Sequence, residues 1–251
     1  MLDKQTFFET IRPSSLFHNS LSQQQVNGID AILSCWNGGP EGLFKGPVYD
    51  AHLSYMLATV YHETARTMSA VREGLNASDA WRKAHLRYYP WYGRGLVQLT
   101  WERNYQRMTT DLKPFFPNID LIKDPDQALD PAIAVGILFY GMSRGSFTGK
   151  SLHTYIHGGV CDFVNARRII NGMDKATMIA GYANVFNQAV VKATAAYKGP
   201  SSVQTAPKAN PINHSQQELT VHLSAEAIAA YHKLDSPDKV IEDALHSAAK
   251  H

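Results

Sequence analysis

A helical pattern that ends in a glutamate constrains the fold of this chain more than any other feature. From Asp50 onward the apolar residues recur at intervals of three and four, at Leu53, Met56, Leu57, Val60 and Tyr61. This spacing predicts a helix with one buried face, which we expect to end near residues 67–70. At about 100° per residue, Glu63 falls about 20° from Met56, at the edge of that face. A carboxylate there is partly desolvated, which favours its neutral form, as a general acid working near neutral pH requires.

His62, beside this glutamate, raises the alternative of a zinc peptidase. The helix motif of those enzymes places two histidines four residues apart on one face. Here the position four residues after His62 is Arg66, so the second ligand is missing. The sequence therefore predicts no metal site and no cofactor.

Hydrolysis of a glycosidic bond by most enzyme families needs a second carboxylate. Glu73 lies ten residues after Glu63, at a distance along the chain that lets a loop bring it back across a cleft. Asp79 is the competing candidate. A wide gap between the two carboxyls would leave room for a water and predict inversion at the anomeric carbon, whereas a narrow gap would predict retention.

The segment Gly93-Arg94-Gly95 predicts a sharp turn or a close approach of another group to the backbone. It lacks the Gly-Lys-Ser/Thr of a phosphate loop and the third glycine of a dinucleotide-binding turn. If the following residues are extended, Gln98 and Thr100 share a side, where an amide and a hydroxyl could hold a water or a sugar hydroxyl. Thr100 is also the expected N-cap of the next helix.

Together these motifs resemble those of glycoside hydrolase family 19, which comprises chitinases and related phage endolysins of the lysozyme-like superfamily. The resemblance covers about residues 5–195, and residues 22–36 are most similar to the phage and prophage branch. The matching residues are His62-Glu63-Thr64, Glu73, Tyr92-Gly93-Arg94-Gly95, Gln98-Leu99-Thr100, Asn104-Tyr105 and Ile169-Ile170-Asn171-Gly172.

The resemblance implies a role for each matching residue. Glu63 would be the general acid and Glu73 the general base, in a reaction that inverts the anomeric configuration. Thr100 would position the attacking water. The expected substrate contacts are Tyr92, Gln98, Asn104 and Asn171. The chain departs from plant members, which carry an arginine where this sequence has Met178; Arg168 or Arg167 could supply that charge, and we take Arg168 as the candidate.

The whole chain is predicted to be all-α, mainly helical and lysozyme-like, with at most a small β element near the substrate cleft. Ser22 and Gln25 have the spacing of a capping box, and Pro131 suits the first turn of a helix. We expect a catalytic domain over residues 1–197, a linker rich in proline over 198–217, and a helical appendage over 218–251. Residues 201–251 hold four Lys and six Asp or Glu, a balance that does not suit binding to anionic lipid.

Composition restricts where such a chain acts. Two cysteines among 251 residues give no disulfide framework, and the N-terminus lacks the pattern of a signal peptide. We therefore expect a monomer made in a bacterial cytoplasm, without stable membrane insertion, that reaches the cell wall through a separate pore former. Residues 66–107 carry eight Lys or Arg against three acids; this charge could attract an anionic wall, and no nucleic-acid recognition motif accompanies it.

Three functions stay open at this point. The first is an endolysin that cleaves the β-1,4 bonds of peptidoglycan glycan strands, as a muramidase. The second is a chitinase, because both polymers contain β-1,4-linked N-acetylated sugars. The third is a catalytically silent module that binds glycan, although a pure binder has no need of two acids.

Overall fold

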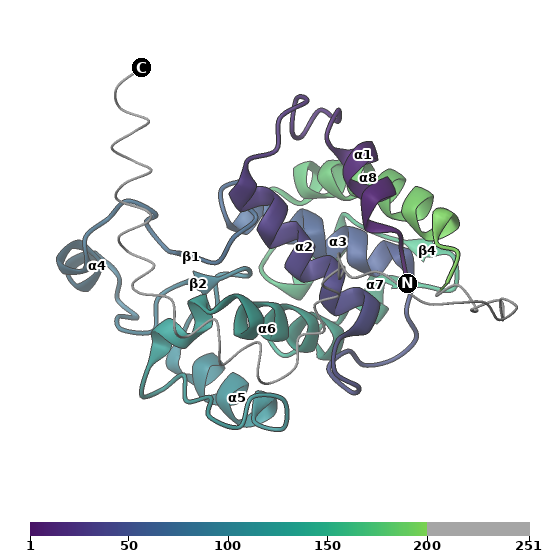
Figure 1. Ribbon diagram of the computed structural model, residues 1–251. Helices are drawn as coiled ribbons and strands as arrows, with labels where there is room; N and C mark the ends of the chain where they lie inside the picture. Colours follow the sequence, from purple (N-terminus) through teal and green to yellow (C-terminus); the bar gives the residue numbers. More distant parts are fainter. Residues whose placement is uncertain (200–251) are drawn as a thin grey trace, which may run out of the picture. The chain divides into compact units, whose positions relative to one another are not determined.

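The computed structural model describes residues 1–199, which form a mainly helical fold (Figure 1). The described helices are α1 (Lys4–Ile11), α2 (Gln23–Gly38), α3 (Asp50–Glu63), α4 (Asp79–His85), α5 (Glu102–Leu112), α6 (Pro131–Arg144), α7 (Leu152–Tyr155) and α8 (Ala176–Ala196). Short 3₁₀ turns span Pro125–Leu129 and Asn165–Ile169. The predicted all-α class with a small β element is confirmed. The predicted appendage, and the linker beyond its first two residues, lie outside the described residues.

The two β elements are antiparallel pairs of two-residue strands. The strands β1 (Val71–Arg72) and β2 (Arg94–Gly95) pair with Val71 opposite Gly95, and β3 (Ile156–His157) pairs with β4 (Val160–Cys161). β1 directly precedes Glu73, and β2 lies inside the Gly-rich segment. The first pair therefore holds together two of the motifs that the sequence singled out.

Helix α3 lies at the centre of the fold and is buried on every side. All residues from Ala51 to Tyr61 are buried, so the prediction of a single buried face was wrong. The reason is that α8 packs along α3 while α2 and α6 also contact it. Some of its polar groups are paired internally: the His52 Nε2–H donates to the Ile156 carbonyl at 2.8 Å, and the Ser54 hydroxyl donates to the Asp50 carbonyl at 2.8 Å. The buried His52 Nδ1 and Tyr55 hydroxyl have no hydrogen-bond partner among residues 1–199.

The end of α3 also differs from expectation, since the helix stops at Glu63 rather than near residues 67–70. The Thr64 hydroxyl donates to the Val60 carbonyl and accepts the Met68 N–H at 3.0 Å, which closes a tight turn. Ala65, Arg66 and Met68 have positive φ angles of 49°, 71° and 60°. Non-glycine residues adopt this conformation only when their surroundings impose it.

Helix α2 imposes that turn. A side chain at Gly28 would overlap the Met68 carbonyl, so only glycine allows the turn to lie this close. The Gln25 side chain donates to the Arg66 carbonyl at 3.0 Å and the Ser69 hydroxyl donates to the Gln24 carbonyl at 3.4 Å. The link between the two candidate acids is therefore fixed against the first turns of α2.

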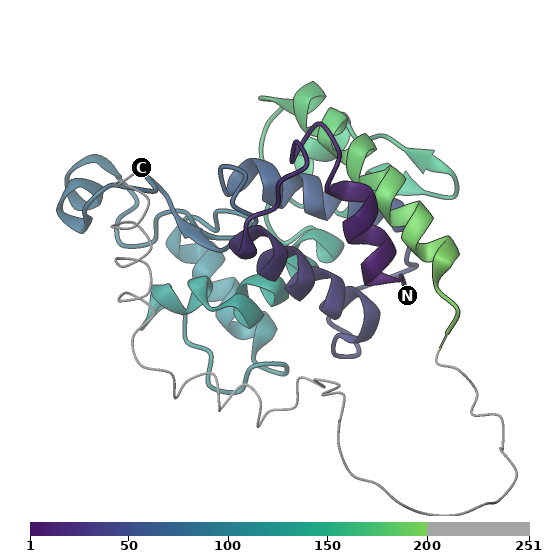
Figure 2. The same cartoon turned by 45° about the horizontal axis from the view of Figure 1, so that its top comes forward.

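The remaining helices complete the layers around α3. α1 packs on α8, and in both views α4 lies at the opposite end of the described fold from these two helices (Figures 1 and 2). Two local predictions are confirmed: Ser22 and Gln25 form a capping box at α2, and Pro131 opens α6, with Asp130 as its N-cap.

Candidate active site

Glu63 is held by a buried arginine. It is the last residue of α3, where the negative end of the helix dipole disfavours a carboxylate. The Arg167 Nη1 donates to Glu63 Oε1 at 2.5 Å; the arginine side chain is 4% exposed and the glutamate side chain 14%. The Arg167 Nε donates to the Asp174 carbonyl at 3.1 Å, which fixes the guanidinium. The contact orients the carboxyl through Oε1.

Glu73 is oriented through both of its carboxyl oxygens. The Tyr88 hydroxyl donates to Oε1 at 2.6 Å, and the Gly93 N–H donates to Oε2 at 2.9 Å. Together the two donors fix the direction in which the carboxyl points. Burial, together with the hydrogen bond to Glu73, raises the pKa of Tyr88 to about 12, so its hydroxyl stays a donor near neutral pH.

The backbone around Glu73 is anchored from two directions. The Arg82 guanidinium, from α4, donates to the Glu73 carbonyl at 2.8 Å and to the Gly74 carbonyl at 3.0 Å. Asp126 accepts from Arg72 at 2.8 Å and from Arg94 at 2.7 Å, so it ties β1 and β2 to the 3₁₀ turn Pro125–Leu129. Burial opposes ionisation of Asp126, but the two arginines outweigh it and lower its pKa.

Gln98, Thr100 and Asn104 are linked by hydrogen bonds, and Gln98 lies close to Glu73, although not as the sequence predicted. Residues 96–98 form a turn, and Gln98 has a φ of 53°, so the segment is not extended. The Gln98 Nε2 donates to backbone carbonyls of β1 and β2. A methyl group at Gly93 would lie 2.7 Å from Gln98 Oε1 and 3.1 Å from Glu73 Oε2, so these two oxygens approach the same point.

Thr100 takes part in this chain of contacts through its backbone and hydroxyl. Its hydroxyl donates to the Gln98 carbonyl at 2.8 Å, and its own carbonyl accepts from the Asn104 side chain at 2.8 Å. The prediction that Thr100 caps α5 was wrong: Trp101 occupies the N-cap position, with no side-chain cap. The predicted positioning of water by Thr100 stays a prediction.

Three further predicted residues lie elsewhere. Tyr92 is 2% exposed, with the Arg94 guanidinium 3.6 Å from its ring centroid, so its side chain packs inside the fold and is not placed to touch substrate. Asp79 is exposed and accepts the Tyr89 hydroxyl at 2.9 Å, apart from the contacts that hold Glu73. Asn171 is exposed, and its backbone N–H donates to the Arg167 carbonyl at 3.1 Å, which places its backbone next to the arginine that holds Glu63.

The choice of Arg168 as the site arginine was wrong, because Arg167 is the residue that contacts Glu63. Arg168 is exposed, and within residues 1–199 its side chain makes a single hydrogen bond, of 3.5 Å, to Asn165 Oδ1. Both arginines lie in the 3₁₀ turn Asn165–Ile169, where adjacent residues point in different directions. Tyr88 was missed altogether; the signal that could have indicated it is the aromatic run Tyr88-Tyr89-Pro90-Trp91-Tyr92 before the Gly-rich turn.

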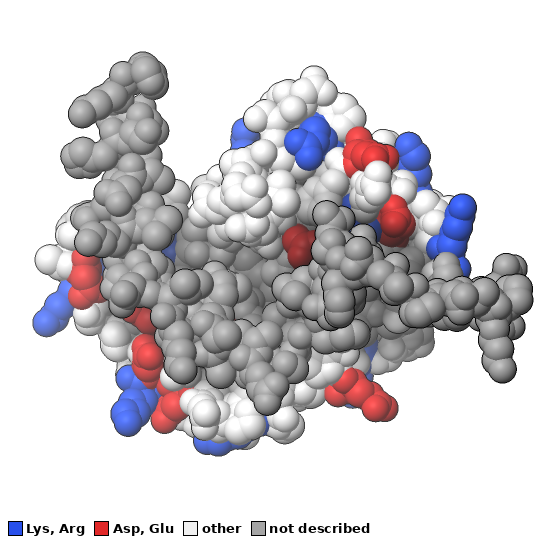
Figure 3. Space-filling model, in the orientation of Figure 1, with Lys and Arg blue, Asp and Glu red and all other residues white. Residues whose placement is uncertain are grey.

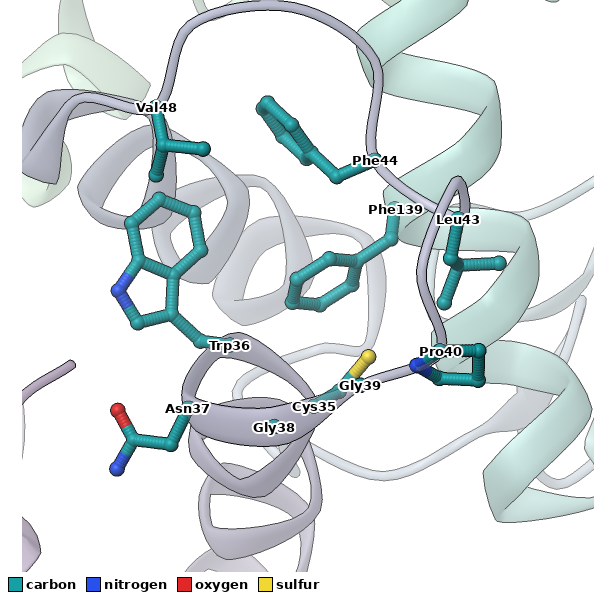
Figure 4. Close-up of a pocket in the computed structure, with 10 residues that line it drawn as sticks. All are labelled: Cys35, Trp36, Asn37, Gly38, Gly39, Pro40, Leu43, Phe44, Val48 and Phe139. Carbon is teal, nitrogen blue, oxygen red and sulfur yellow. The ribbon is translucent and has the colours of Figure 1, made fainter.

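A hollow of about 180 Å³ at the C-terminal end of α2 contains none of the predicted site residues. Figure 4 shows the rings of Trp36, Phe44 and Phe139 around it, with centroids 6.0 to 6.4 Å apart. It has no carboxylate or imidazole in its lining. Burial raises the pKa of the Cys35 thiol to about 12, so this sulfur is not a nucleophile near neutral pH.

Charges of both signs are mixed on the uncovered part of the face shown in Figure 3. Within residues 1–199, no group of three or more His, Cys, Asp or Glu side chains is arranged to hold a metal ion. Among the helices of this same stretch, none combines the length and the apolar character needed to cross a membrane.

Comparison of the sequence with protein families and with curated proteins found no match. Among solved structures, the fold is similar to that of chitinase C from Streptomyces griseus HUT6037, with a TM-score of 0.50, 20% identity, and coverage of 77% of this chain and 78% of that chain. A variant of chitinase C (TM-score 0.46, 18% identity, 77% and 94% covered) and a bacterial family 19 chitinase (TM-score 0.47, 20% identity, 75% and 94% covered) are also similar. The chain therefore has a chitinase-like fold.

Proposed function

We propose that this chain is a glycoside hydrolase that cleaves the β-1,4 bonds of peptidoglycan strands, with Glu63 as general acid and Glu73 as general base. The observation that carries the proposal is the fixed orientation of both carboxyls. One oxygen of Glu63 is bound by a buried arginine, and both oxygens of Glu73 accept hydrogen bonds. General acid–base catalysis depends on such fixed geometry.

In the proposed reaction, Glu63 is protonated on Oε2 in the complex with substrate and gives that proton to the leaving glycosidic oxygen, while Glu73 removes a proton from the attacking water. The carbonyl oxygen of the Gln98 side chain, next to Glu73 Oε2, supplies a second acceptor for that water. Attack from the face opposite the leaving group inverts the anomeric carbon. On this proposal the substrate is in the bacterial wall, which the enzyme reaches through a separate pore former.

Chitin is the second candidate substrate, and the similarity of the fold to chitinase C supports it. The two polymers share the bond that is cleaved, so the same two acids serve either. A direct test is incubation of the protein with isolated peptidoglycan and with chitin oligomers, with products identified by mass spectrometry. NMR then shows which anomer of the new reducing end is formed first.

We expect new reducing ends from peptidoglycan with the wild-type protein, and a loss of at least about 100-fold for Glu63→Gln and for Glu73→Gln. Asp79→Asn is the matched control and should keep full activity, because this exposed carboxylate accepts a hydrogen bond from Tyr89 and takes no part in the hydrogen bonds that hold Glu73. Equal activity of wild type and Glu63→Gln would refute the assignment. Cleaved peptides in place of sugars would point to an amidase or peptidase, and intact polymer that is still bound would indicate a silent glycan-binding module.

A further inference from the structure

A tryptophan with an unusual backbone contacts Tyr88, the residue whose hydroxyl donates to Glu73. Trp101 is 41% exposed, although it is a large apolar residue, and its φ is 76°. A side chain disfavours this φ because the Cβ comes close to the backbone, which is why glycine usually occupies such positions. The fold therefore keeps an indole ring at the surface in a conformation that a glycine would adopt more easily.

Backbone contacts on both sides fix the Trp101 backbone, from which the indole projects. The Trp101 N–H donates to the Trp91 carbonyl at 2.9 Å, and the Trp101 carbonyl accepts the N–H groups of Asn104 at 2.9 Å and Tyr105 at 3.2 Å. Trp101 is thus held between the aromatic run and the first turn of α5. A ring held in this way loses little freedom when a ligand binds.

The neighbours of the indole connect it to the proposed base. The Tyr88 ring meets it edge to face, with centroids 5.1 Å apart, and the Tyr88 hydroxyl donates to Glu73 at 2.6 Å. The guanidinium of the exposed Arg87 lies 5.1 Å from the centroid of the indole. One aromatic ring therefore separates a partly exposed indole, which has a cation over its ring, from the carboxylate of the proposed base.

We propose that Trp101, Tyr88 and Arg87 form a platform that binds a sugar ring of the substrate strand next to the cleaved bond, and that Arg87 favours strands carrying carboxylates. The proposal rests on the proposed function, because it takes Glu73 as the point of cleavage. The C–H groups on one face of a β-linked pyranose are apolar and slightly positive, and they pack against the negative face of an indole. Arg87 can then pair with an acidic substituent of the same strand.

This platform should distinguish the two candidate polymers by their charge. Peptidoglycan strands carry carboxylates on their stem peptides, or on the lactyl groups where no peptide is attached, whereas chitin is neutral. Stacking on Trp101 should serve both polymers, and the Arg87 contact should serve only the acidic one. Because the contact is between exposed charges, salt should weaken it.

The test measures binding by calorimetry in the Glu63→Gln background, with two soluble ligands: an N-acetylglucosamine oligomer and a peptidoglycan strand fragment with its carboxylates intact. Trp101→Ala should weaken binding of both at least about tenfold. Arg87→Gln should weaken binding of the acidic fragment by about threefold to tenfold, leave the neutral oligomer unchanged, and reduce the salt dependence of binding. Trp81→Ala is the matched control, since Trp81 is 43% exposed but stacks on His85 of its own helix.

Trp101→Gly separates a binding role from a folding role. Glycine relieves the positive φ, so this variant should melt no lower than the parent while binding as weakly as Trp101→Ala. Unchanged binding by Trp101→Ala, or an equal loss in Trp81→Ala, would overturn the platform. Equal weakening of both ligands by Arg87→Gln would overturn the selection for carboxylates. Cleavage by the Glu63→Gln parent would overturn the proposed function alone and leave the binding result standing.

Discussion

Removal of the Arg167 guanidinium should destabilise the protein more than removal of any exposed charge. In Arg167→Met the Glu63 carboxylate, only 14% exposed, loses the cation that pairs with it. Breaking one side of a buried ion pair costs about 3–5 kcal/mol, because the other charge is left without a partner. Since Glu63 keeps some contact with solvent, we expect about 3 kcal/mol, near the lower end of that range. For a chain of this size, that corresponds to a melting temperature lower by about 6–12 °C.

Urea unfolding of two further variants separates the causes of that loss. Arg168→Met changes the exposed neighbour and should shift the free energy of unfolding by no more than about 0.5 kcal/mol. The double variant Glu63→Met/Arg167→Met removes both charges and should recover most of the loss, because an apolar pair can replace a buried ion pair. What the double variant does not recover measures the Arg167 hydrogen bond to the Asp174 carbonyl, about 1 kcal/mol.

Two results would refute this reasoning. A cost below about 1 kcal/mol for Arg167→Met would mean that Glu63 finds water or another donor as good as the arginine. An equal cost for Arg168→Met would mean that the turn Asn165–Ile169, rather than the ion pair, carries the stability. In either case the account of how Glu63 is held would fail, whatever the activity of the variants.

Three other substitutions test separate parts of the structure. Gly93→Ala should cost about 1 kcal/mol of stability but lower activity about 100-fold, because the new methyl group displaces the Glu73 carboxyl. The turnover rate and the melting temperature are measured on one sample. Gly28→Ala should cost about 3 kcal/mol in urea unfolding because its methyl group meets a backbone carbonyl, whereas Gly38→Ala in the same helix meets nothing within 4 Å and should be neutral or stabilising. Burial lowers the pKa of His52, so below about pH 6.5 the unfolded chain binds more protons than the folded one, and the free energy of unfolding decreases as the pH is lowered. His52→Gln should reduce this pH dependence, measured by urea unfolding.

Features that depend on a few neighbouring residues could be predicted from the sequence. The capping box at Ser22 uses contacts three residues apart, and Pro131 begins α6 because the first helical position needs no N–H donor. The burial of α3 on every side could not be read from its own pattern, since it depends on α8, more than a hundred residues later. The early end of the same helix depends on the missing side chain of Gly28.

The site shows the same division between local and distant contacts. The motifs indicated Glu63 and Glu73 as the two candidate acids, but the groups that hold them are Arg167 and Tyr88, which lie 104 and 15 residues away along the chain. A hydrogen bond across such a separation leaves no periodic pattern in a single sequence. The choice between two adjacent arginines failed for a related reason, because only the packing of the turn decides which one points inward.

The two acids are held by different kinds of structure. This difference predicts which variants lose both stability and activity and which lose activity alone. Glu63 ends a helix that is buried on all sides, and its arginine is buried too, so changes there should lower stability and activity together. Glu73 lies in an irregular loop, and its carboxyl is held by Tyr88 and the Gly93 N–H. Because these contacts orient a carboxyl rather than fill the core, their loss should lower activity while the melting temperature changes little. A set of variants in which both quantities fall together at both acids would contradict this division of roles.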